Sequence, residues 1–355
     1  MSRKKEFDFE NLPQASKDIY ELRMEAPDLT RLAGAVRTTC GDTISPDAIS
    51  DAIAARLDAD SLSIPVLAVK GASGQGKTLV ATAGVHGDEY EGMEAIFRIY
   101  EALDPSNLSG TFVAVPVVTL PAFWQATRAN PVDGLNMARI FPGSSSGSMS
   151  ERLATLMLEK VFRHADLYID LHSAGRNNAM MTLVGYASLG RQAETARAAA
   201  ECFGAPLIWE HPKVSPGRTL TETLKLEIPS LYTEARGGGQ AHPDDVDCYT
   251  RGLANLLAFL DMAKLPAAGL EADYEPLRLC GDGDVDVSMK SASSGLFFSG
   301  ARVGMRVREG ESLGMIRDLD GTPLEEVRSP QDGVLVMIRT NPRIFAGEVL
   351  LVINA

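Results

Sequence analysis

The sequence predicts an α/β protein with a mostly parallel central sheet, followed by a separate all-β module. From residue 62 onward, apolar segments rich in β-branched residues alternate with segments whose apolar residues recur at helical spacing. A stretch containing Pro, Ala and Gly interrupts this alternation at residues 264–276, and short apolar strands punctuated by glycine follow it. The first pattern is typical of an α/β layer fold, and the second is typical of a small barrel or sandwich.

The elements of the α/β region follow one another along the chain. The strongest helix is predicted at residues 148–162, where Ser148 and Glu151 have the spacing of a capping box. Ligands of such a fold bind at the carboxyl ends of its strands. We expect further helices at 91–103 and 250–263, and strands at 63–71, 78–85, 110–118, 165–173 and 228–235.

The segment before the α/β region is polar and mixed in composition. A helix is predicted within residues 47–59, where Ser50 or Asp51 is a candidate N-cap. The chain therefore divides into a partly helical N-terminal extension at 1–60, a main domain at 61–265 and a β module at 275–355.

The charge of the chain excludes some classes of partner. The 355 residues include 47 Asp and Glu against 34 Lys and Arg, a formal net charge of −13. Nucleic acids and anionic lipid surfaces require a basic face, so we expect neither as a partner. The start of the chain lacks the apolar stretch of a signal peptide, no membrane span is predicted, and the four cysteines form no C-x-x-C pair. These features predict a cytoplasmic protein.

One glycine-rich motif resembles a nucleotide-binding loop. Residues 71–78, Gly-Ala-Ser-Gly-Gln-Gly-Lys-Thr, match the pattern G-x-x-x-x-G-K-[ST]. That pattern binds phosphate only where a helix begins at its Lys-Thr pair, and here a predicted strand begins instead. We therefore interpret the glycines as the turn of a hairpin that joins two strands.

Two of the five histidines lie at the ends of predicted strands. His86 and Glu89 come three residues apart after the strand at 78–85, and His172 lies in Asp-Leu-His at the end of the strand at 165–173. Two histidines and a carboxylate are the protein ligands of a catalytic zinc site that keeps its fourth position for water. The combination predicts such a site, with zinc as the metal that these ligand types favour and cobalt or nickel as alternatives in vitro.

A hydrolytic metal site also needs a base and a cation. Glu234 lies at the carboxyl end of the strand predicted at 228–235 and precedes three glycines, which makes it the candidate general base. Arg128 and Arg139 are the candidates for stabilising the negative charge of a tetrahedral intermediate.

Taken in order, these motifs resemble the succinylglutamate desuccinylase/aspartoacylase family of the zinc carboxypeptidase-like superfamily, and most closely its N-acetyl-diaminobutyrate deacetylase-like members. The matching motifs are HGDE, R-x-x-P-x-D-G-x-N-x-x-R-x-F-P-G, DLHS and TEA with glycines. The resemblance implies a three-layer α/β/α domain with a mixed, mostly parallel sheet, and a C-terminal barrel-sandwich domain similar to lipoyl domains. It implies the following roles: zinc ligands His86, Glu89 and His172, one zinc per chain, general base Glu234, Arg128 near the scissile carbonyl, and Arg139 with Asn136 in substrate binding.

Two features depart from what the resemblance implies. Ala138 stands where the family usually has an asparagine that helps the following arginine, here Arg139, to hold a substrate carboxylate. Carboxylate recognition therefore rests on Arg139 alone or is supplied elsewhere. The expected hairpin tip of the β module, Asp318–Thr322, carries no lysine, so we do not expect lipoylation.

These observations predict a zinc-dependent amidohydrolase that removes an acyl group from a small N-acylated amino acid or amine. A carboxypeptidase-like metallopeptidase is the alternative that uses the same chemistry, and a non-catalytic binding protein is a third. The sequence does not identify the acyl group or the amine. It leaves a homo-oligomer open and gives no role to the N-terminal extension.

Overall fold

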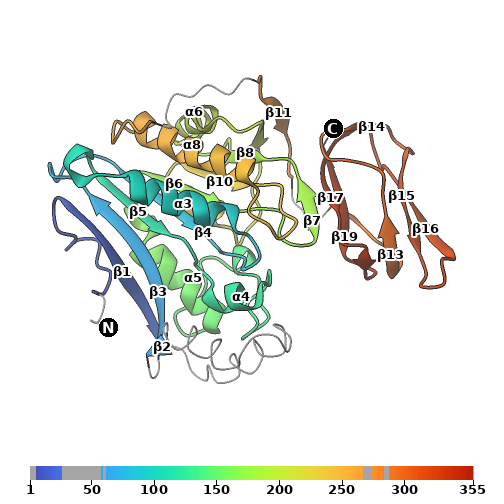
Figure 1. Cartoon of the computed structure of the whole chain (residues 1–355), viewed down its shortest axis with the longest axis horizontal. Helices are drawn as coiled ribbons and strands as arrows, with labels where there is room; N and C mark the ends of the chain where they lie inside the picture. Colours follow the sequence, from blue (N-terminus) through green and yellow to red (C-terminus); the bar gives the residue numbers. More distant parts are fainter. Residues whose placement is uncertain (1–4, 26–56, 59–60, 267–273, 284–287, 355) are drawn as a thin grey trace.

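The computed structural model describes residues 5–25, 57–58, 61–266, 274–283 and 288–354. A ten-stranded mixed sheet forms the centre of the main domain (Figure 1). Its strands are β1 (Ser16–Glu25), β2 (Leu57–Asp58), β3 (Ser61–Lys70), β4 (Thr78–Ala83), β5 (Thr111–Val115), β6 (Leu167–Leu171), β8 (Leu183–Ala187), β9 (Leu207–His211), β10 (Ser230–Glu234) and β11 (Leu277–Cys280).

The strand order is β1-β3-β5-β4-β6-β10-β8-β9-β11, with β2 paired to β3. The runs β5-β4-β6-β10 and β8-β9-β11 are parallel, whereas β1-β3-β5 and β10-β8 are antiparallel. Strands β4, β5, β6 and β8 are buried along their whole lengths. Such burial is expected of central strands with both faces covered, and it confirms the prediction of an α/β fold with a mixed, mostly parallel sheet.

Helices cover both faces of this sheet. Helix α3 packs against α8, and α8 packs against α6, so these three form one layer. Helices α4 and α5 lie on the other side of the sheet (Figure 1). The helices are α3 (Glu91–Ala102), α4 (Leu120–Gln125), α5 (Met149–Lys160), α6 (Ala193–Phe203), α7 (Thr219–Lys225) and α8 (Pro243–Phe259), and short 3-10 helices span Pro105–Asn107, Met137–Arg139 and Phe162–His164.

The capping box predicted at the start of α5 is present. The Ser148 side chain accepts from the Glu151 backbone N–H at 3.4 Å, and the Glu151 carboxylate accepts from the Ser148 backbone N–H at 2.8 Å. Each side chain thus satisfies a backbone donor that the first turn of a helix leaves open, which fixes where α5 begins.

The C-terminal module consists of two antiparallel sheets. One has the order β12-β19-β17-β14, and the other β16-β15-β13-β18. The predicted hairpin tip joins β15 to β16, where the Asp318 backbone N–H donates to the Thr322 carbonyl at 2.8 Å. The strands of the module are β12 (Met289–Lys290), β13 (Gly295–Phe298), β14 (Arg306–Val307), β15 (Ser312–Arg317), β16 (Pro323–Arg328), β17 (Gly333–Arg339), β18 (Arg343–Ile344) and β19 (Val349–Asn354).

A short strand of the main domain joins the module to it. Strand β7 (Asn178–Met180) pairs with β17, and its residue Ala179 also forms a bridge with Gly237. An apolar cluster continues across this junction, with Trp209 of β9 and Val336 of β17 among its members. The module therefore packs directly on the part of the main domain that follows His172 and Glu234.

Three expectations from the sequence need correction. Residues 16–25 form β1, a long edge strand of the main sheet that the sequence did not reveal. The helix expected at 47–59 lies mostly outside the described residues, and Leu57–Asp58 near its end form strand β2 instead. Residues 71–78 do join two strands, and no helix begins at Lys77, but β5 lies between β3 and β4, so these strands do not form a hairpin.

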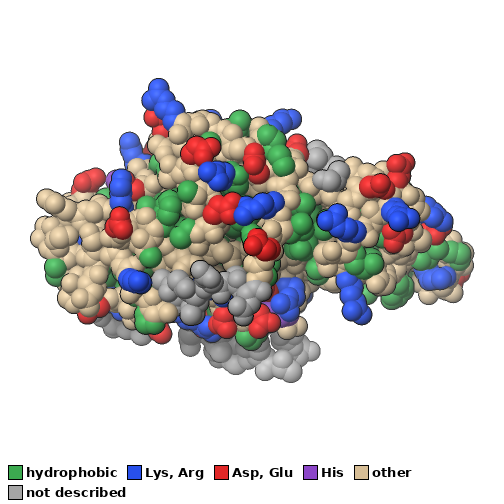
Figure 2. All heavy atoms as spheres, turned by 90° about the horizontal axis from the view of Figure 1, so that it is seen from above, with side chains coloured by type: hydrophobic (Ala, Val, Ile, Leu, Met, Phe, Trp, Pro, Cys, Tyr) green, Lys and Arg blue, Asp and Glu red, His purple; other side chains and the backbone are tan. Residues whose placement is uncertain are grey.

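Acidic and basic side chains are interspersed on the face of the molecule that Figure 2 shows. Within the described ranges, no helix has the length and apolarity needed to cross a membrane.

Candidate metal centre

The predicted metal ligands lie at the carboxyl ends of two neighbouring strands. Strands β4 and β6 are adjacent and parallel, so the segments that leave them meet at one edge of the sheet. His172 directly follows β6, and the turn after β4 carries His86 and Glu89 to the start of α3. Gly87 makes this turn possible, because a Cβ at that position would lie 1.9 Å from the backbone carbon of Ala122.

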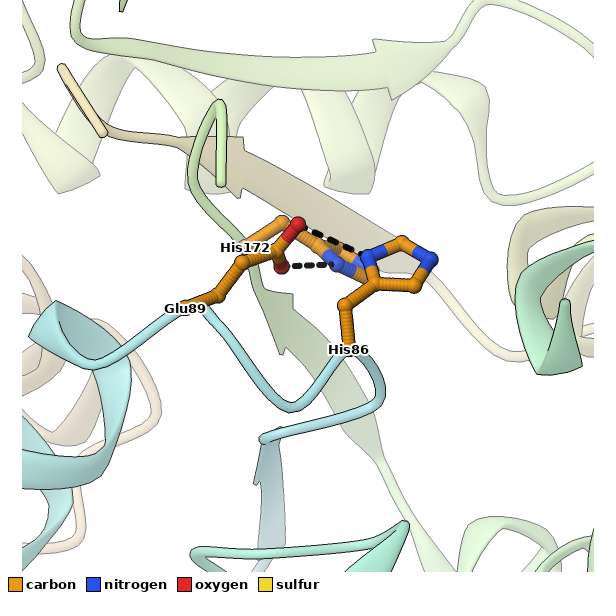
Figure 3. A group of neighbouring side chains, drawn as sticks. All are labelled: His86, Glu89 and His172. Atoms are coloured by element: carbon orange, nitrogen blue, oxygen red, sulfur yellow. Dashed lines mark hydrogen bonds and ion pairs between the residues drawn. The ribbon is translucent and has the colours of Figure 1, made fainter. Parts of the chain in front are cut away.

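His86, Glu89 and His172 form one buried cluster. The Glu89 carboxylate lies between the two imidazoles, with Oε1 at 2.8 Å from His86 Nδ1 and Oε2 at 2.9 Å from His172 Nδ1 (Figure 3). One ligand atom from each residue lies within 4.8 Å of the others, and all three side chains are buried. The structure thus brings together the three residues in which the sequence predicts a metal site.

The outer nitrogens of both imidazoles have hydrogen-bond partners. His172 Nε2 donates to Asp170 Oδ2 at 3.1 Å, and His86 Nε2 donates to Asn136 Oδ1 at 3.0 Å. When a ring is neutral, this partner leaves the lone pair of its Nδ1 facing Glu89, and a lone pair that faces a carboxylate needs a proton or a metal cation between them. Partners of this kind fix the tautomer of metal-binding histidines. The donor set therefore fits a zinc ion, held by the two Nδ1 atoms and Glu89.

The surroundings of Asp170 hold it in place. The Thr82 hydroxyl donates to Oδ1 at 2.8 Å, and the Thr219 hydroxyl donates to Oδ2 at 3.1 Å. Burial opposes the charge of Asp170, but His172 and the two hydroxyls more than offset it and lower the pKa of this carboxyl. The carboxylate behind His172 is therefore charged.

The electrostatics of the cluster suit a cation. Burial, together with the positive charge of Arg128, lowers the pKa of His86 to about 4, so this ring is neutral at physiological pH. Although burial opposes it, His86 and His172 hold the pKa of Glu89 far below its ordinary value. Burial also works against the charge of His172, but Asp170 and Glu89 raise the pKa of this ring well above its ordinary value. A metal ion would take the place of that positive charge.

The candidate base and Arg128 lie beside the cluster. Arg128 Nη1 is 3.3 Å from both His86 Nδ1 and Glu89 Oε1. Burial, followed by the charge of Glu89, raises the pKa of Glu234 to about 8, while His172 and the two arginines oppose the rise. A carboxyl group with a pKa near neutrality suits proton transfer in both directions.

A narrow inner cavity of about 110 Å³ connects these groups. It is lined by both histidines of the cluster, by the catalytic candidates Glu234 and Arg128, and by Ala138 and Arg139. Arg139 donates to the Ala138 carbonyl at 3.1 Å. Asn136 does not line the cavity; its side chain contacts His86 and the backbone N–H of Ala138, so its predicted role in substrate binding is not tested by these contacts.

The inner cavity is also lined by His211 and Tyr232, which the sequence analysis does not single out. His211 Nδ1 donates to the Gly281 carbonyl at 2.8 Å, and the Tyr232 hydroxyl donates to His211 Nε2 at 2.8 Å. Burial lowers the pKa of His211, so the ring is neutral. His211 ends β9 as His172 follows β6, and this shared position at a strand end is the signal that could have found it.

Asp170 is a further residue that the sequence analysis does not single out, although its spacing from His172 is a simple signal in the sequence. It lies two residues before His172, so both side chains point to the same face of the extended chain. A carboxylate in that position is placed to contact the histidine that follows it.

Comparisons with known proteins agree with this geometry. Over 296 residues the chain is 29% identical to the N-alpha-acetyl-L-2,4-diaminobutyric acid deacetylase of Halomonas elongata, covering 82% of this chain and 85% of that protein. A succinylglutamate desuccinylase/aspartoacylase structure from Rhodobacter sphaeroides has a TM-score of 0.74 and 30% identity, covering 83% of this chain and 89% of the other.

The product-bound ectoine utilization protein EutE (DoeB) from Ruegeria pomeroyi has a similar fold along the whole chain. Its TM-score is 0.79 at 24% identity, and 97% of each chain is covered. The sequence model of the succinylglutamate desuccinylase/aspartoacylase catalytic domain matches residues 75–260, which are more than half of the 355 residues and carry all the cluster side chains. The chain belongs to the succinylglutamate desuccinylase/aspartoacylase family.

Proposed function

We propose that this protein is a zinc-dependent amidohydrolase that removes an acyl group from a small N-acylated amino acid or amine. The observation that carries the proposal is a single cavity lined by two histidines of the metal cluster together with Glu234, Arg128 and Arg139. The relatives support the reaction class, because deacetylases and desuccinylases hydrolyse amides.

Zinc bound by His86, Glu89 and His172, one ion per chain, would supply a Lewis acid and lower the pKa of a bound water toward about 7. The chain's own residues carry the proton and the charge. Glu234 accepts a proton from the attacking water and later donates it to the nitrogen of the leaving amine. Water oxygen bonds to the acyl carbon, the C–N bond breaks, and the products are a carboxylate and an amine.

Arg128 is placed to stabilise the oxygen of the scissile carbonyl. Its guanidinium lies beside the metal cluster, within 3.3 Å of Glu89 Oε1. A fixed cation in a site that is partly closed to water stabilises the negative charge that develops on that oxygen as water adds. Glu89 and His86 beside it are buried, whereas the Arg128 side chain is 45% exposed.

A hydrolysis screen tests the proposal. The zinc-loaded protein is incubated with N-acetyl, N-succinyl and N-formyl amino acids, with N-acetyl-2,4-diaminobutyrate as the first substrate and with short peptides alongside. We expect release of amine from at least one N-acyl substrate and none from the peptides. Hydrolysis of peptides alone would favour the carboxypeptidase-like alternative, and no hydrolysis of any amide would contradict the proposal.

A further inference from the structure

The candidate base and one candidate metal ligand lie at the ends of two paired strands. Strand β10 pairs in parallel with β6, and the pairing continues past the end of β6. The His172 backbone N–H donates to the Thr233 carbonyl at 3.1 Å, and the Ala235 backbone N–H donates to the His172 carbonyl at 3.2 Å. Because Glu234 lies between Thr233 and Ala235, the same backbone bonds position the base and the metal ligand relative to each other.

The chain that leaves Glu234 has little rigidity of its own. Gly237, Gly238 and Gly239 follow two residues after Ala235, with φ of 80°, 75° and 69°. Glycine adopts this left-handed region readily, but it also loses more conformational freedom than any other residue when it is fixed. A segment with three consecutive glycines therefore needs contacts from elsewhere to hold the strand end in one position.

One face of helix α8 supplies these contacts. His242 is the N-cap of α8, and Asp245 and Tyr249 follow within its first two turns. The spacing of i, i+3 and i+7 places the three side chains on the same face of the helix. Asp245 and Tyr249 are buried, and none of the three lines the inner cavity. We call these three side chains the α8 clamp.

Two members of the α8 clamp hold the segment after the base. Asp245 Oδ2 accepts from the Arg236 backbone N–H at 3.3 Å and lies 3.6 Å from the Arg236 guanidinium. Asp245 Oδ1 accepts from the Thr182 hydroxyl at 2.6 Å, which orients the carboxylate. His242 Nε2 donates to the Gly237 carbonyl at 3.0 Å. The chain is thus fastened to α8 at two successive residues, the first of which is only two residues past Glu234.

The third member holds the metal ligand. The Tyr249 hydroxyl donates to the His172 carbonyl at 2.7 Å. This carbonyl has two lone pairs, and it also accepts from the Ala235 backbone N–H. A single carbonyl group therefore connects the metal ligand to α8 and to the residue that follows Glu234.

We propose that Asp245 and Tyr249 are positioning residues of the candidate active site. Asp245 fixes the segment that follows Glu234 and thereby the position of the base, and Tyr249 fixes His172 through its carbonyl. The inference rests on the proposed amidohydrolase function and adds to it two residues that do not touch the substrate. Small displacements of a base or a metal ligand are costly, so these contacts should matter for zinc affinity and turnover more than for substrate binding.

The role of Tyr249 is tested by Tyr249→Phe, which removes the hydroxyl and keeps the ring. We expect zinc affinity, measured by competition with a chelator, to fall up to about tenfold, as one lost hydrogen bond allows. The matched control is Tyr274→Phe, which removes a hydroxyl that donates to the Gly204 carbonyl at 3.0 Å before β11 begins. Zinc affinity in this control should equal that of the parent protein.

The role of Asp245 is tested by Asp245→Asn, which keeps the shape of the side chain and removes its charge and one acceptor. We expect kcat to fall about 10- to 100-fold while KM and bound zinc stay unchanged. Amide hydrogen exchange, followed by mass spectrometry, should become faster in residues 235–239. Asp247→Asn removes a carboxylate from the exposed side of the same helix, at its ion pair with Arg98, and should leave all of these quantities unchanged.

Parent-like zinc affinity in Tyr249→Phe, or parent-like kcat in Asp245→Asn, would overturn the role assigned to that residue. A parallel fall of kcat, substrate affinity, zinc affinity and melting temperature in both variants would show a merely structural role and overturn the inference as a whole. If the parent protein hydrolyses none of the amides, the proposed function fails. The zinc affinity of Tyr249→Phe and the hydrogen exchange of Asp245→Asn would then still decide whether α8 holds the two strand ends.

Discussion

The two ends of the candidate active site are built in opposite ways. At the metal end, the three ligand side chains are buried, and each histidine has a partner behind it: Asp170 behind His172 and Asn136 behind His86. The cleft end is a second cavity, of about 360 Å³ and lined by both domains, where Lys290 of the module is exposed and unpaired among the described residues. The metal end is therefore preorganised, whereas Lys290 at the cleft end has no such support.

This difference separates the residues that the chemistry requires from those that the module adds to the cleft. A site that binds a metal and moves protons needs fixed geometry, because small displacements of ligands are costly. A cleft wall that a separate module supplies can change without disturbing the metal. The effects of substitutions at the two ends should then differ in kind as well as in size.

The largest effect is expected from removing a metal ligand. Glu89→Ala should abolish stoichiometric zinc binding and reduce hydrolysis to the uncatalysed rate, because the two imidazoles lose the carboxylate that lies between them. Metal content by mass spectrometry and turnover measure the two effects. Glu94→Ala removes a carboxylate from helix α3, which begins just after Glu89, at the Arg98 ion pair, and is the matched control. Full zinc occupancy in Glu89→Ala would show that the metal binds elsewhere.

The next effect separates the base from the metal. Glu234→Gln should retain zinc and lose about 10²- to 10⁴-fold in turnover, the usual contribution of general acid–base catalysis. Because the amide keeps the shape of the carboxyl group, substrate affinity should change little. Turnover close to that of the parent protein would remove Glu234 from the mechanism.

Substitutions behind the ligands should have intermediate effects. Asp170→Asn keeps a hydrogen-bond acceptor for His172 but removes its charge, and it should weaken zinc binding about 10- to 100-fold. Asn136→Ala removes a neutral partner from His86 and should cost less. Competition with a chelator measures both affinities, and thermal unfolding shows whether the fold is intact. A larger loss in Asn136→Ala than in Asp170→Asn would contradict the roles assigned to the two side chains.

The smallest effect concerns stability and pH in the metal-free protein. The folded structure raises the pKa of Glu234 from its ordinary 4.5 to about 8, so folding favours the protonated carboxyl. The contribution of Glu234 to the stability of the fold is thus fully present below pH 4.5 and is lost as the pH rises toward 8. Because the Glu234 side chain is only partly buried, solvent limits this loss of folding free energy to about 1–2 kcal/mol. Metal-free Glu234→Gln should therefore unfold at a higher temperature than the parent at pH 8 and at the same temperature at pH 4.5.

The pH comparison is informative in both directions. A stabilisation of the same size at both pH values would show that the gain comes from packing and not from the carboxyl group. No stabilisation at pH 8 would mean that Glu234 keeps an ordinary pKa in the fold.

The sequence predicts the metal end far better than the cleft end. His86 and His172 can be found because apolar segments rich in β-branched residues predict β4 and β6, and the ends of adjacent parallel strands meet. No local pattern predicts β7, three residues long, because its stability comes from pairing with β17 far along the chain. Lys290 has no signal in the sequence at all, since only the packing of two domains places it near Glu234.

The same reasoning explains the errors at the N-terminal side. Residues 16–25 contain more charged side chains than is usual for a buried strand. They form β1 because all ten pair with residues of β3. The glycine-rich segment 71–78 predicts a hairpin because the two strands that it joins are consecutive in the sequence. In the fold, β5 is inserted between them and pairs antiparallel with β3 and parallel with β4.

A zinc titration tests the central claim most directly. The protein is stripped with a chelator, zinc is returned in small steps, and hydrolysis of the best N-acyl substrate is followed at each step. The arrangement of His86, Glu89 and His172 predicts no activity without metal, a linear rise, and saturation at one zinc per chain. Activity that survives the chelator, or that bears no fixed relation to the zinc bound, would contradict it.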